Sequence, residues 1–284
     1  MPELASVNGR MLPIAEACIP IDDRGFLLGD GVYEVIVVRG GKLLLFDEHL
    51  ARLRRSLDGV RMNYVELPPI VAQVRALCAA AGLPEAKLYL QVTRGVAPRN
   101  HAFPQPAPAP NVVMTVRELH PLAAESFADG VACLTRPDIR WGRVDIKTIN
   151  LLPNCLAKQD AAEAGCFEAI FIGPDGAARE ATAANLFVVR GGVALTHPEN
   201  ERILSGVTRN LLLRLMRENG MPVREVAATR EEMMTADEVF LTGTTTEVMP
   251  VVRIDGRPIG GGKPGPFARR LLAIFRDWLA KAIV

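Results

Sequence analysis

The feature that most restricts the fold of this chain is a series of short β-prone runs joined by tight turns. The first pair, Tyr33 to Val38 and Lys42 to Phe46, is separated by Gly40-Gly41. Two glycines between such runs are typical of a β-hairpin. Further β-prone runs cover residues 87–93, 112–117, 131–135, 168–172, 184–189 and 239–242. The pattern therefore predicts hairpins and mixed strand pairing, without the regular βαβ alternation of a parallel sheet.

Segments with helical periodicity lie between these runs. Asp47 is expected to cap a helix on which Leu50, Leu53 and Leu57 recur at helical spacing. The other predicted helices cover residues 68–82, 154–164, 208–218 and 264–283. A few helices among many short strands indicate an α+β fold.

The chain of 284 residues is long enough for two domains. The pattern pauses around His120-Pro121-Leu122, which predicts a small α+β domain over 1–120 and a larger domain over 121–284. A Pro-rich loop, Gly95 to Pro110, interrupts the first domain. A loop of this length in a compact domain is often functional.

Composition excludes several classes of partner. The formal net charge is +1, so no global field attracts nucleic acid or an anionic membrane. Met1 to Glu16 lacks a basic segment followed by an apolar run, and no stretch approaches the roughly 20 apolar residues of a membrane span. Five cysteines without a CxxC pair and four scattered histidines argue against a metal site. We expect a cytoplasmic protein.

Lys147 differs from the five other lysines, which fall at turns, strand ends or helix surfaces. Ile146, Ile149 and Leu151 surround Lys147 with apolar positions. A lysine in low dielectric is more readily deprotonated, and its free amine can form a Schiff base. The ordinary alternative is a strand-end lysine whose ammonium group reaches water.

Two polar segments could bind an anion. Ser205-Gly206-Val207-Thr208 leads directly into a predicted helix, whose first N–H groups and dipole would suit a phosphate. Ordinary N-capping is the alternative. Thr242-Gly243-Thr244-Thr245-Thr246 follows a predicted strand and offers further hydroxyl groups, although alone it is a polar turn.

Glu180 and the pair Arg99 and His101 are the remaining candidates. Glu180 follows a polar run and begins a β-prone stretch through Val189. Such an acid is normally solvated, but if buried it could pair with a protonated pyridine nitrogen. Arg99 and His101 stand two residues apart in the long loop, and the arginine fork matches a carboxylate. Two polar residues in a polar loop carry little weight by themselves.

Taken together, these segments resemble the fold-type-IV family of pyridoxal-phosphate enzymes. That family includes branched-chain aminotransferases, D-amino-acid transaminases and aminodeoxychorismate lyases. The segments that carry the resemblance are Asp23-Arg24-Gly25, 29–34, 47–53, Asp145-Ile146-Lys147 with Asn150-Leu151-Leu152, Glu180 with Asn185, 206–209, and 242–245 with Glu247. They occur in the family's order and cover nearly the whole chain, from Asn8 to Trp278.

The resemblance implies a role for each candidate. Lys147 is expected to form the Schiff base with pyridoxal 5'-phosphate and then to move the Cα proton. Glu180 is expected to pair with the pyridinium nitrogen. The expected phosphate ligands are Arg52, the backbone of Val207 and Thr208, and Thr244 with Gly243. Tyr33, Arg99 and His101 resemble the substrate-carboxylate trap of D-amino-acid transaminases.

The implied architecture is a small α+β domain and a larger pseudo-barrel domain, with the cofactor in the cleft between them. The family assembles as a homodimer in which Arg99 and His101 would reach the partner's site. The implied reaction converts D-alanine, or another D-amino acid, and 2-oxoglutarate to pyruvate, or another 2-oxo acid, and D-glutamate.

Several alternatives stay open. The same machinery could act on L-branched-chain amino acids, as an aminodeoxychorismate lyase, or on chiral amines. A silent phosphate-binding protein with this fold is the alternative from another class. Many D-amino-acid transaminases have a serine run where this chain has Ala181-Thr182-Ala183-Ala184, and Gly243 stands where serine is common. Without these hydroxyl groups the wall of the site near the cofactor is expected to be more apolar, which leaves the amino-acid preference open.

Overall fold

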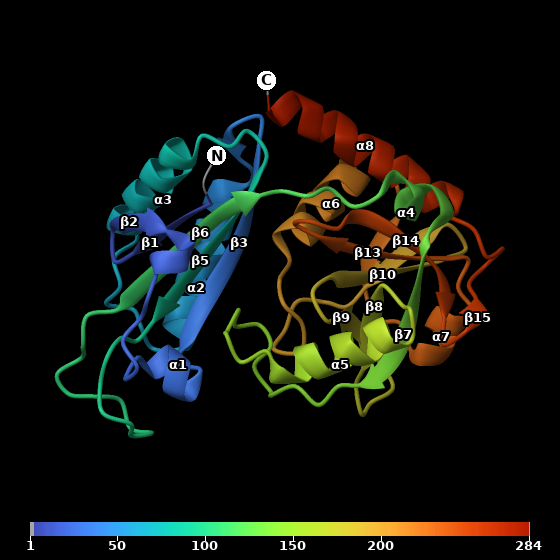
Figure 1. Ribbon diagram of the computed structural model, residues 1–284. Coiled ribbons are helices and arrows are strands. Elements are labelled where there is room, and N and C mark those ends of the chain that lie inside the picture. The colour runs from blue at the N-terminus through green and yellow to red at the C-terminus, as the bar shows by residue number, and fades with distance from the viewer. Residues whose placement is uncertain (1–2, 284) are drawn as a thin grey trace. The chain divides into compact units, whose positions relative to one another are not determined.

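A computed structural model describes residues 3–283 of the chain, which divide into two compact units (Figure 1). The first unit contains residues up to His120 together with 146–150, and the second contains 121–145 and 151–282. The sequence assigns 146–150 to the second domain. This segment packs in the first unit because its backbone pairs with a strand there, with a bridge between Val32 and Thr148.

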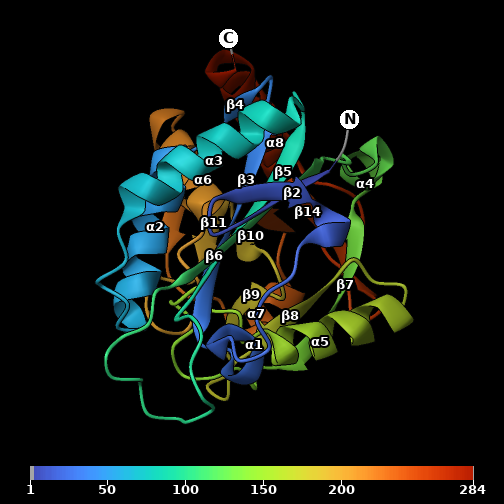
Figure 2. The same cartoon turned by 60° about the vertical axis from the view of Figure 1, so that its left-hand side comes forward.

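The first unit is built on a six-stranded antiparallel sheet with the order β2-β1-β6-β5-β3-β4. Its strands are β1 (Leu4–Val7), β2 (Arg10–Pro13), β3 (Gly31–Arg39), β4 (Lys42–Leu43), β5 (Ala86–Thr93) and β6 (Asn111–Glu118). Its helices are η1 (Ile14–Glu16), α1 (Arg24–Leu28), α2 (Phe46–Gly59) and α3 (Leu67–Ala81). Helices α2 and α3 cover one face of the sheet, as Figure 2 shows, and share a continuous hydrophobic core with it.

The core of the first unit explains why these helices dock. Leu53 and Leu57 of α2 and Val74 and Leu77 of α3 are fully buried against the sheet. Burial of one such side chain contributes about 1.5–3 kcal/mol relative to leaving it in water. The apolar residues that recur at helical spacing in the sequence therefore lie on the helix faces that pack against the sheet.

The first hairpin is shorter than the sequence predicts. Strand β4 ends at Leu43, and α2 begins at Phe46, one residue before the predicted cap Asp47. Leu45 precedes the helix with a φ of 52°, and its left-handed backbone ends the extended run. A left-handed leucine leaves no compositional signal, since glycine and asparagine are the residues that usually adopt this conformation.

The second unit is a nine-stranded mixed sheet that closes on itself. Its strands are β7 (Val131–Pro137), β8 (Glu168–Ile172), β9 (Ala178–Ala181), β10 (Asn185–Arg190), β11 (Val193–Thr196), β12 (Val223–Glu225), β13 (Glu238–Gly243), β14 (Glu247–Ile254) and β15 (Arg257–Pro258). Strand β9 pairs with both β8 and β10, which completes a ring through β13, β14 and β7. The predicted α+β class and the pseudo-barrel of the larger domain are confirmed.

Five helices accompany this sheet: α4 (Ala124–Asp129), α5 (Leu152–Glu163), α6 (Val207–Glu218), α7 (Arg230–Met234) and α8 (Pro266–Ala282). Helix α5 connects the parallel strands β7 and β8, and α8 packs against β13 and β14. Within residues 3–283, none of the helices is long and apolar enough to cross a lipid bilayer. The same residues contain no cluster of His, Cys, Asp and Glu side chains that could hold a metal ion.

Glu180 lies inside a strand of its own, whereas the sequence places it at the start of a stretch that continues to Val189. The residues between β9 and β10 form a turn, so the two strands run antiparallel with Glu180 opposite Asn185. The turn has the sequence Thr182-Ala183-Ala184 and contains no glycine or proline, so the usual signals of a turn are missing.

Candidate active site

Lys147 lies along the outer edge of β3 in the first unit. The backbone N–H of Tyr33 donates a hydrogen bond of 2.9 Å to the Lys147 carbonyl. The Lys147 N–H donates one of 3.1 Å to the Ser56 hydroxyl on α2. Its ammonium nitrogen is 4.1 Å from the centroid of the Tyr33 ring. Strand and helix thus fix the Lys147 backbone, and the structure brings Lys147 and Tyr33 together as a pair.

Arg52 forms a buried ion-pair cluster with Glu34 and His49. The Arg52 Nε and Nη2 groups donate hydrogen bonds of 2.8 and 2.7 Å to the two Glu34 carboxylate oxygens. His49 Nδ1 is 2.8 Å from the same carboxylate. This two-point contact fixes the plane of the guanidinium. The predicted phosphate ligand is therefore held in one orientation by Glu34, to which the sequence assigned no role.

The charges of this cluster are set by its surroundings. Burial acts to raise the pKa of Glu34, but the Arg52 charge and the hydrogen bonds from Arg52 and His49 outweigh it and hold the pKa at about 2. Burial lowers the pKa of His49, and Glu34 offsets only part of that effect. Glu34 is therefore an anion and His49 a neutral ring at pH 7. A signal existed in the sequence, because His49 and Arg52 are spaced three residues apart on one helix face.

Acid should destabilise the chain through Glu34. Its pKa is lower in the folded chain than the ordinary value of 4.5, so its stabilisation is complete above that value and is lost as the pH falls toward about 2. The shift corresponds to about 3 kcal/mol. We expect the thermal unfolding midpoint of the wild type to fall across this window, and that of Glu34→Gln to fall much less. Thermal unfolding followed by circular dichroism between pH 6 and 2 provides the measurement.

Glu48→Gln is the matched control for this experiment, because Glu48 is exposed on the same helix. Its profile should follow that of the wild type. A difference between wild type and Glu34→Gln that stays constant from pH 6 to pH 2 would contradict the ionisation assigned to Glu34.

The long loop of the first unit is anchored by two buried arginines. Arg24 donates a hydrogen bond of 2.6 Å to the Asn100 carbonyl, and the Arg94 guanidinium lies 3.6 Å from the centroid of the Phe103 ring. Asp30 accepts hydrogen bonds from both arginines at distances of 2.8–3.0 Å. The loop is therefore attached to the sheet at defined points, although its sequence is rich in proline and has no regular structure.

Arg99 and His101 extend from this anchored loop. Both side chains are exposed, and within residues 3–283 neither forms a hydrogen bond or an ion pair. A single chain therefore leaves the predicted carboxylate trap open to a further molecule. The structure does not bring Arg99 and His101 into a polar contact with the Lys147 and Tyr33 pair.

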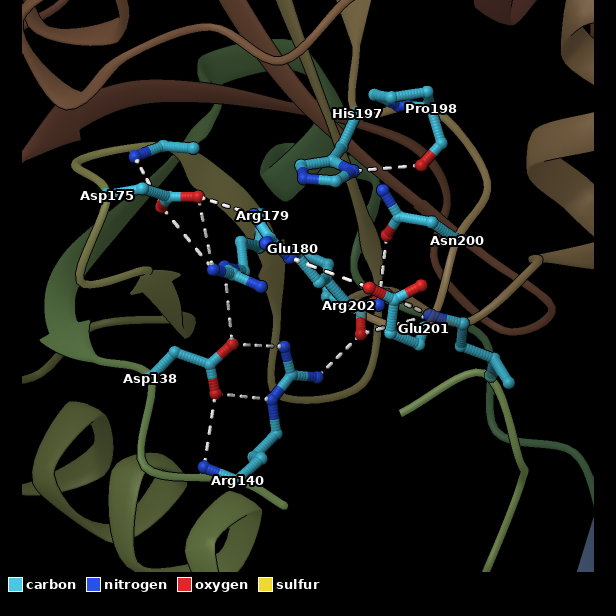
Figure 3. Close-up of polar contacts among 12 residues, drawn as sticks. Asp138, Arg140, Asp175, Arg179, Glu180, His197, Pro198, Asn200, Glu201 and Arg202 are labelled. Carbon is cyan, nitrogen blue, oxygen red and sulfur yellow. Dashed lines mark hydrogen bonds and ion pairs between the residues drawn. The ribbon is translucent and has the colours of Figure 1, made fainter. Parts of the chain in front are cut away.

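Glu180 is buried in the second unit, and both of its carboxylate oxygens accept hydrogen bonds (Figure 3). Arg140 Nη1 donates to Oε1 at 2.5 Å, and Asn185 Nδ2 donates to Oε2 at 3.0 Å. The Leu204 N–H lies 3.2 and 3.1 Å from the two oxygens. Burial raises the pKa of Glu180, and the charge and hydrogen bond of Arg140 reduce that rise. Arg140 was not identified from the sequence, since it lies forty residues away in a loop.

Helix α6 presents its N-terminus without a side-chain cap. The helix begins at Val207, and the preceding Gly206 has no side chain to accept from the first N–H groups. A Cβ atom at Gly206 would lie 1.9 Å from the Asn185 side-chain oxygen, so only glycine fits there. The predicted anion-binding residues Val207 and Thr208 therefore supply N–H groups at the positive end of a helix dipole.

The turn that contains Gly243 and Thr244 follows directly from the same sheet. Strand β10 pairs with β13 so that Asn185 lies opposite Thr242, as it lies opposite Glu180 on the other side. The buried Thr242 hydroxyl has no hydrogen-bond partner within residues 3–283. A Cβ atom at Gly243 would come within 3.3 Å of the Thr246 hydroxyl. Glu180, Asn185 and Thr242 thus form one row across three strands, next to the Gly243–Thr244 turn.

Comparison with known proteins assigns a family to this arrangement. The family model described as class IV amino-transferase matches residues 31–254. A D-alanine aminotransferase of Bacillus licheniformis is 42% identical over 266 residues, which cover 93% of each chain. The chain belongs to the class IV aminotransferases. A D-alanine aminotransferase of Staphylococcus haemolyticus is 36% identical to this class IV aminotransferase over 274 residues, 96% of each chain.

Solved structures agree with this assignment. The branched-chain amino acid aminotransferase of Escherichia coli superimposes with a TM-score of 0.89 at 25% identity, covering 98% of this class IV aminotransferase and 94% of its own chain. The T.th. branched-chain amino acid aminotransferase with pyridoxamine 5'-phosphate gives a TM-score of 0.85 at 29% identity, with coverages of 96% and 93%. The family's cofactor is pyridoxal 5'-phosphate, and the enzyme is a pyridoxal-phosphate-dependent aminotransferase.

The residues of this class IV aminotransferase fit that cofactor. Lys147 would supply the amine, and the buried Glu180 would supply a carboxylate for a protonated ring nitrogen. The uncapped start of α6 would supply N–H donors for a phosphate. The buried Thr242 hydroxyl, in the same row of strand residues as Glu180, is left without a hydrogen-bond partner within residues 3–283. Lys147 and Arg52 belong to the first unit, whereas Glu180, Thr208 and Thr244 belong to the second.

Proposed function

We propose that this class IV aminotransferase transfers the amino group of D-alanine, or another D-amino acid, to 2-oxoglutarate. The products are pyruvate, or the corresponding 2-oxo acid, and D-glutamate. The observation that carries the proposal is the fixed Lys147, whose amine lies over the Tyr33 ring in a chain 42% identical to a D-alanine aminotransferase. When bound, pyridoxal phosphate supplies an electron sink for negative charge at the substrate Cα.

Lys147 has two tasks in this proposal. Its amine would hold the cofactor covalently, and the same amine in its free form would move the proton of the substrate Cα. Both tasks require a fixed backbone and a side chain that can move. The hydrogen bonds from Tyr33 and to Ser56 hold the backbone, and the side chain is only half-buried.

Glu180 and the phosphate ligands orient the cofactor. Glu180 would accept a hydrogen bond from the ring nitrogen and balance its positive charge. The N–H groups of Val207 and Thr208 would bind the phosphate with Thr244, Gly243 and Arg52. Support for this assignment comes from the uncapped N-terminus of α6 and from the orientation that Glu34 imposes on Arg52.

Arg99 and His101 would bind the substrate carboxylate in the site of a second copy of the chain. Their exposure on an anchored loop supports this role, because exposed side chains at a fixed position can contact another molecule. The homodimer that the family resemblance implies would supply this second copy of the chain. The five free thiols suit a reducing compartment, and we place the enzyme in the cytoplasm.

Replacement of Arg99 tests the choice of substrate. A charge-assisted contact with a carboxylate contributes about 1.5–3 kcal/mol, so Arg99→Ala should lower kcat/KM about tenfold or more. The loss should be similar for D-amino acids with different side chains and much smaller for an amine that lacks the carboxylate. Steady-state rates with D-alanine, D-leucine and a chiral amine give the comparison.

The control for this experiment is Arg117→Ala, which removes an exposed arginine that pairs with Glu3 on the same unit. Its rates should match those of the wild type. A wild-type preference for L-leucine or L-valine over D-alanine would reject the proposed stereochemistry. It would favour the alternative of an L-branched-chain aminotransferase.

A further inference from the structure

A buried chain of charges leads to Glu180 from the loop that follows β7. Arg140 donates to the Glu180 carboxylate at 2.5 Å and makes two hydrogen bonds of 2.9 Å to Asp138. The three side chains are 4–7% exposed, so water cannot screen these charges. Figure 3 shows the Arg140 guanidinium between the two carboxylates, and its centre lies 4.4 Å from the Phe171 ring centroid.

Arg140 contributes what the other partners of Glu180 cannot. Asn185 and the Leu204 N–H are neutral donors, which orient the carboxylate but add no opposite charge. A carboxylate that is buried without a counter-ion tends to take up a proton. A protonated Glu180 could no longer balance a positive ring nitrogen. The cation beside it therefore decides whether Glu180 can act.

Asp138 in turn holds Arg140 and moderates its charge. The guanidinium contacts both carboxylate oxygens of Asp138, and the backbone N–H of Arg140 also donates a hydrogen bond of 3.1 Å to Asp138. Asp138 is a second anion beside the Arg140 guanidinium. The net electrostatic stabilisation of the Glu180 anion is therefore smaller than it would be if Arg140 paired with Glu180 alone. Three donors, from Arg140, Asn185 and the Leu204 N–H, share the roughly four acceptor sites of the Glu180 carboxylate, which leaves room for one more donor.

We propose that Arg140, held by Asp138, is a positioning residue that keeps Glu180 anionic and aimed for the cofactor's ring nitrogen. This inference rests on the proposed function of Glu180. Arg140 acts through Glu180 and is not assigned a contact with the cofactor or the substrate.

The other cations near Glu180 pair with carboxylates other than Glu180. Arg179 on β9 lies 3.7 Å from Asp138 and 3.3 Å from Asp175. Arg202 pairs with Asp175 at 2.7 Å, and Glu201 is exposed beside it. Burial lowers the pKa of His197, so the ring adds no charge near pH 7. Arg140 and Asp138 are therefore the groups whose charges act most directly on Glu180.

Two substitutions should move the titration of Glu180 in opposite directions. Arg140→Met removes the neighbouring cation, so Glu180 should take up its proton at higher pH than in the wild type. Asp138→Asn removes the second anion and leaves Arg140 in place, so Glu180 should take up its proton at lower pH. Arg140→Lys keeps the charge and should stay near the wild type.

The experiment is infrared spectroscopy of the full-length protein freed of cofactor, titrated from pH 4 to 9. The signal is the band of a protonated carboxyl group, assigned to Glu180 by its loss in Glu180→Gln. The same proteins are then titrated with pyridoxal phosphate, and Arg140→Met should bind it about tenfold more weakly or worse. Arg143→Met is the matched control, because Arg143 forms the same kind of pair with Asp145 but is exposed.

Opposite shifts for Arg140→Met and Asp138→Asn, with Arg143→Met unchanged, would support the proposal. Shifts in the same direction, or no shift, would overturn it and leave Arg140 a purely structural residue. If Arg140→Met does not fold, the direction of the shift in Asp138→Asn still tests the proposal, with Arg140→Lys as the variant that keeps the charge. The infrared titration needs no cofactor, so a wild type that fails to bind pyridoxal phosphate would reject the proposed function independently.

Discussion

Lys147→Ala should abolish transamination while the chain remains folded. The substitution removes both the covalent attachment of the cofactor and the base that moves the Cα proton. Proton transfer by a positioned side chain alone contributes about 10²- to 10⁴-fold, so we expect a loss of about a thousandfold or more, about 4 kcal/mol or above. The contacts with Tyr33 and Ser56 use the backbone, which alanine retains. Single-turnover rates with D-alanine and the circular dichroism spectrum measure the two outcomes.

The visible absorption of the lysine-bound cofactor should disappear in the same variant. Borohydride reduction of the wild type followed by peptide mapping should place the cofactor on Lys147. Lys263→Ala is the control, since Lys263 lies in a glycine-rich loop of the second unit, and it should keep both the absorption and the activity. Modification of Lys158 or Lys263 in the wild type would show that Lys147 is not the attachment site.

Glu180→Gln should give the second largest loss. The amide keeps the size of the side chain but cannot balance a positive ring nitrogen, so negative charge at the substrate Cα is less well stabilised. Loss of one charge-assisted hydrogen bond of about 1.5–3 kcal/mol corresponds to a roughly 10- to 150-fold slower proton abstraction. Stopped-flow measurement of the first half-reaction with D-alanine isolates this step from product release.

The structure sharpens this second prediction. Arg140 would remain bound to Asp138 in Glu180→Gln, so the variant should fold and the effect should be chemical. Glu231→Gln, at an exposed position at the start of α7, serves as the control and should react at the wild-type rate. An unchanged half-reaction in Glu180→Gln would show that Glu180 does not face the ring nitrogen.

Short-range sequence patterns predicted many of the helices and strands. Glycine ended α3 at Gly82, where φ is 61°, and apolar spacing predicted the buried faces of α2 and α6. Periodicity and turns succeed because they depend on neighbours a few residues away. Errors arose where such signals were silent, as at the left-handed Leu45 and in the turn between β9 and β10.

The sequence by itself determined the family, the α+β class and the candidate residues, because the motifs around Lys147, Glu180 and Thr208 preserve their order and spacing. Only the tertiary structure decided which charges meet. Glu34 and Arg52 come together from a strand and a helix, and Arg140 reaches Glu180 across forty residues. Ion pairing with Arg52 then keeps Glu34 anionic, and burial keeps His49 neutral. Desolvation and ion pairing depend on which side chains the fold encloses together, and no short-range pattern in the sequence encodes that.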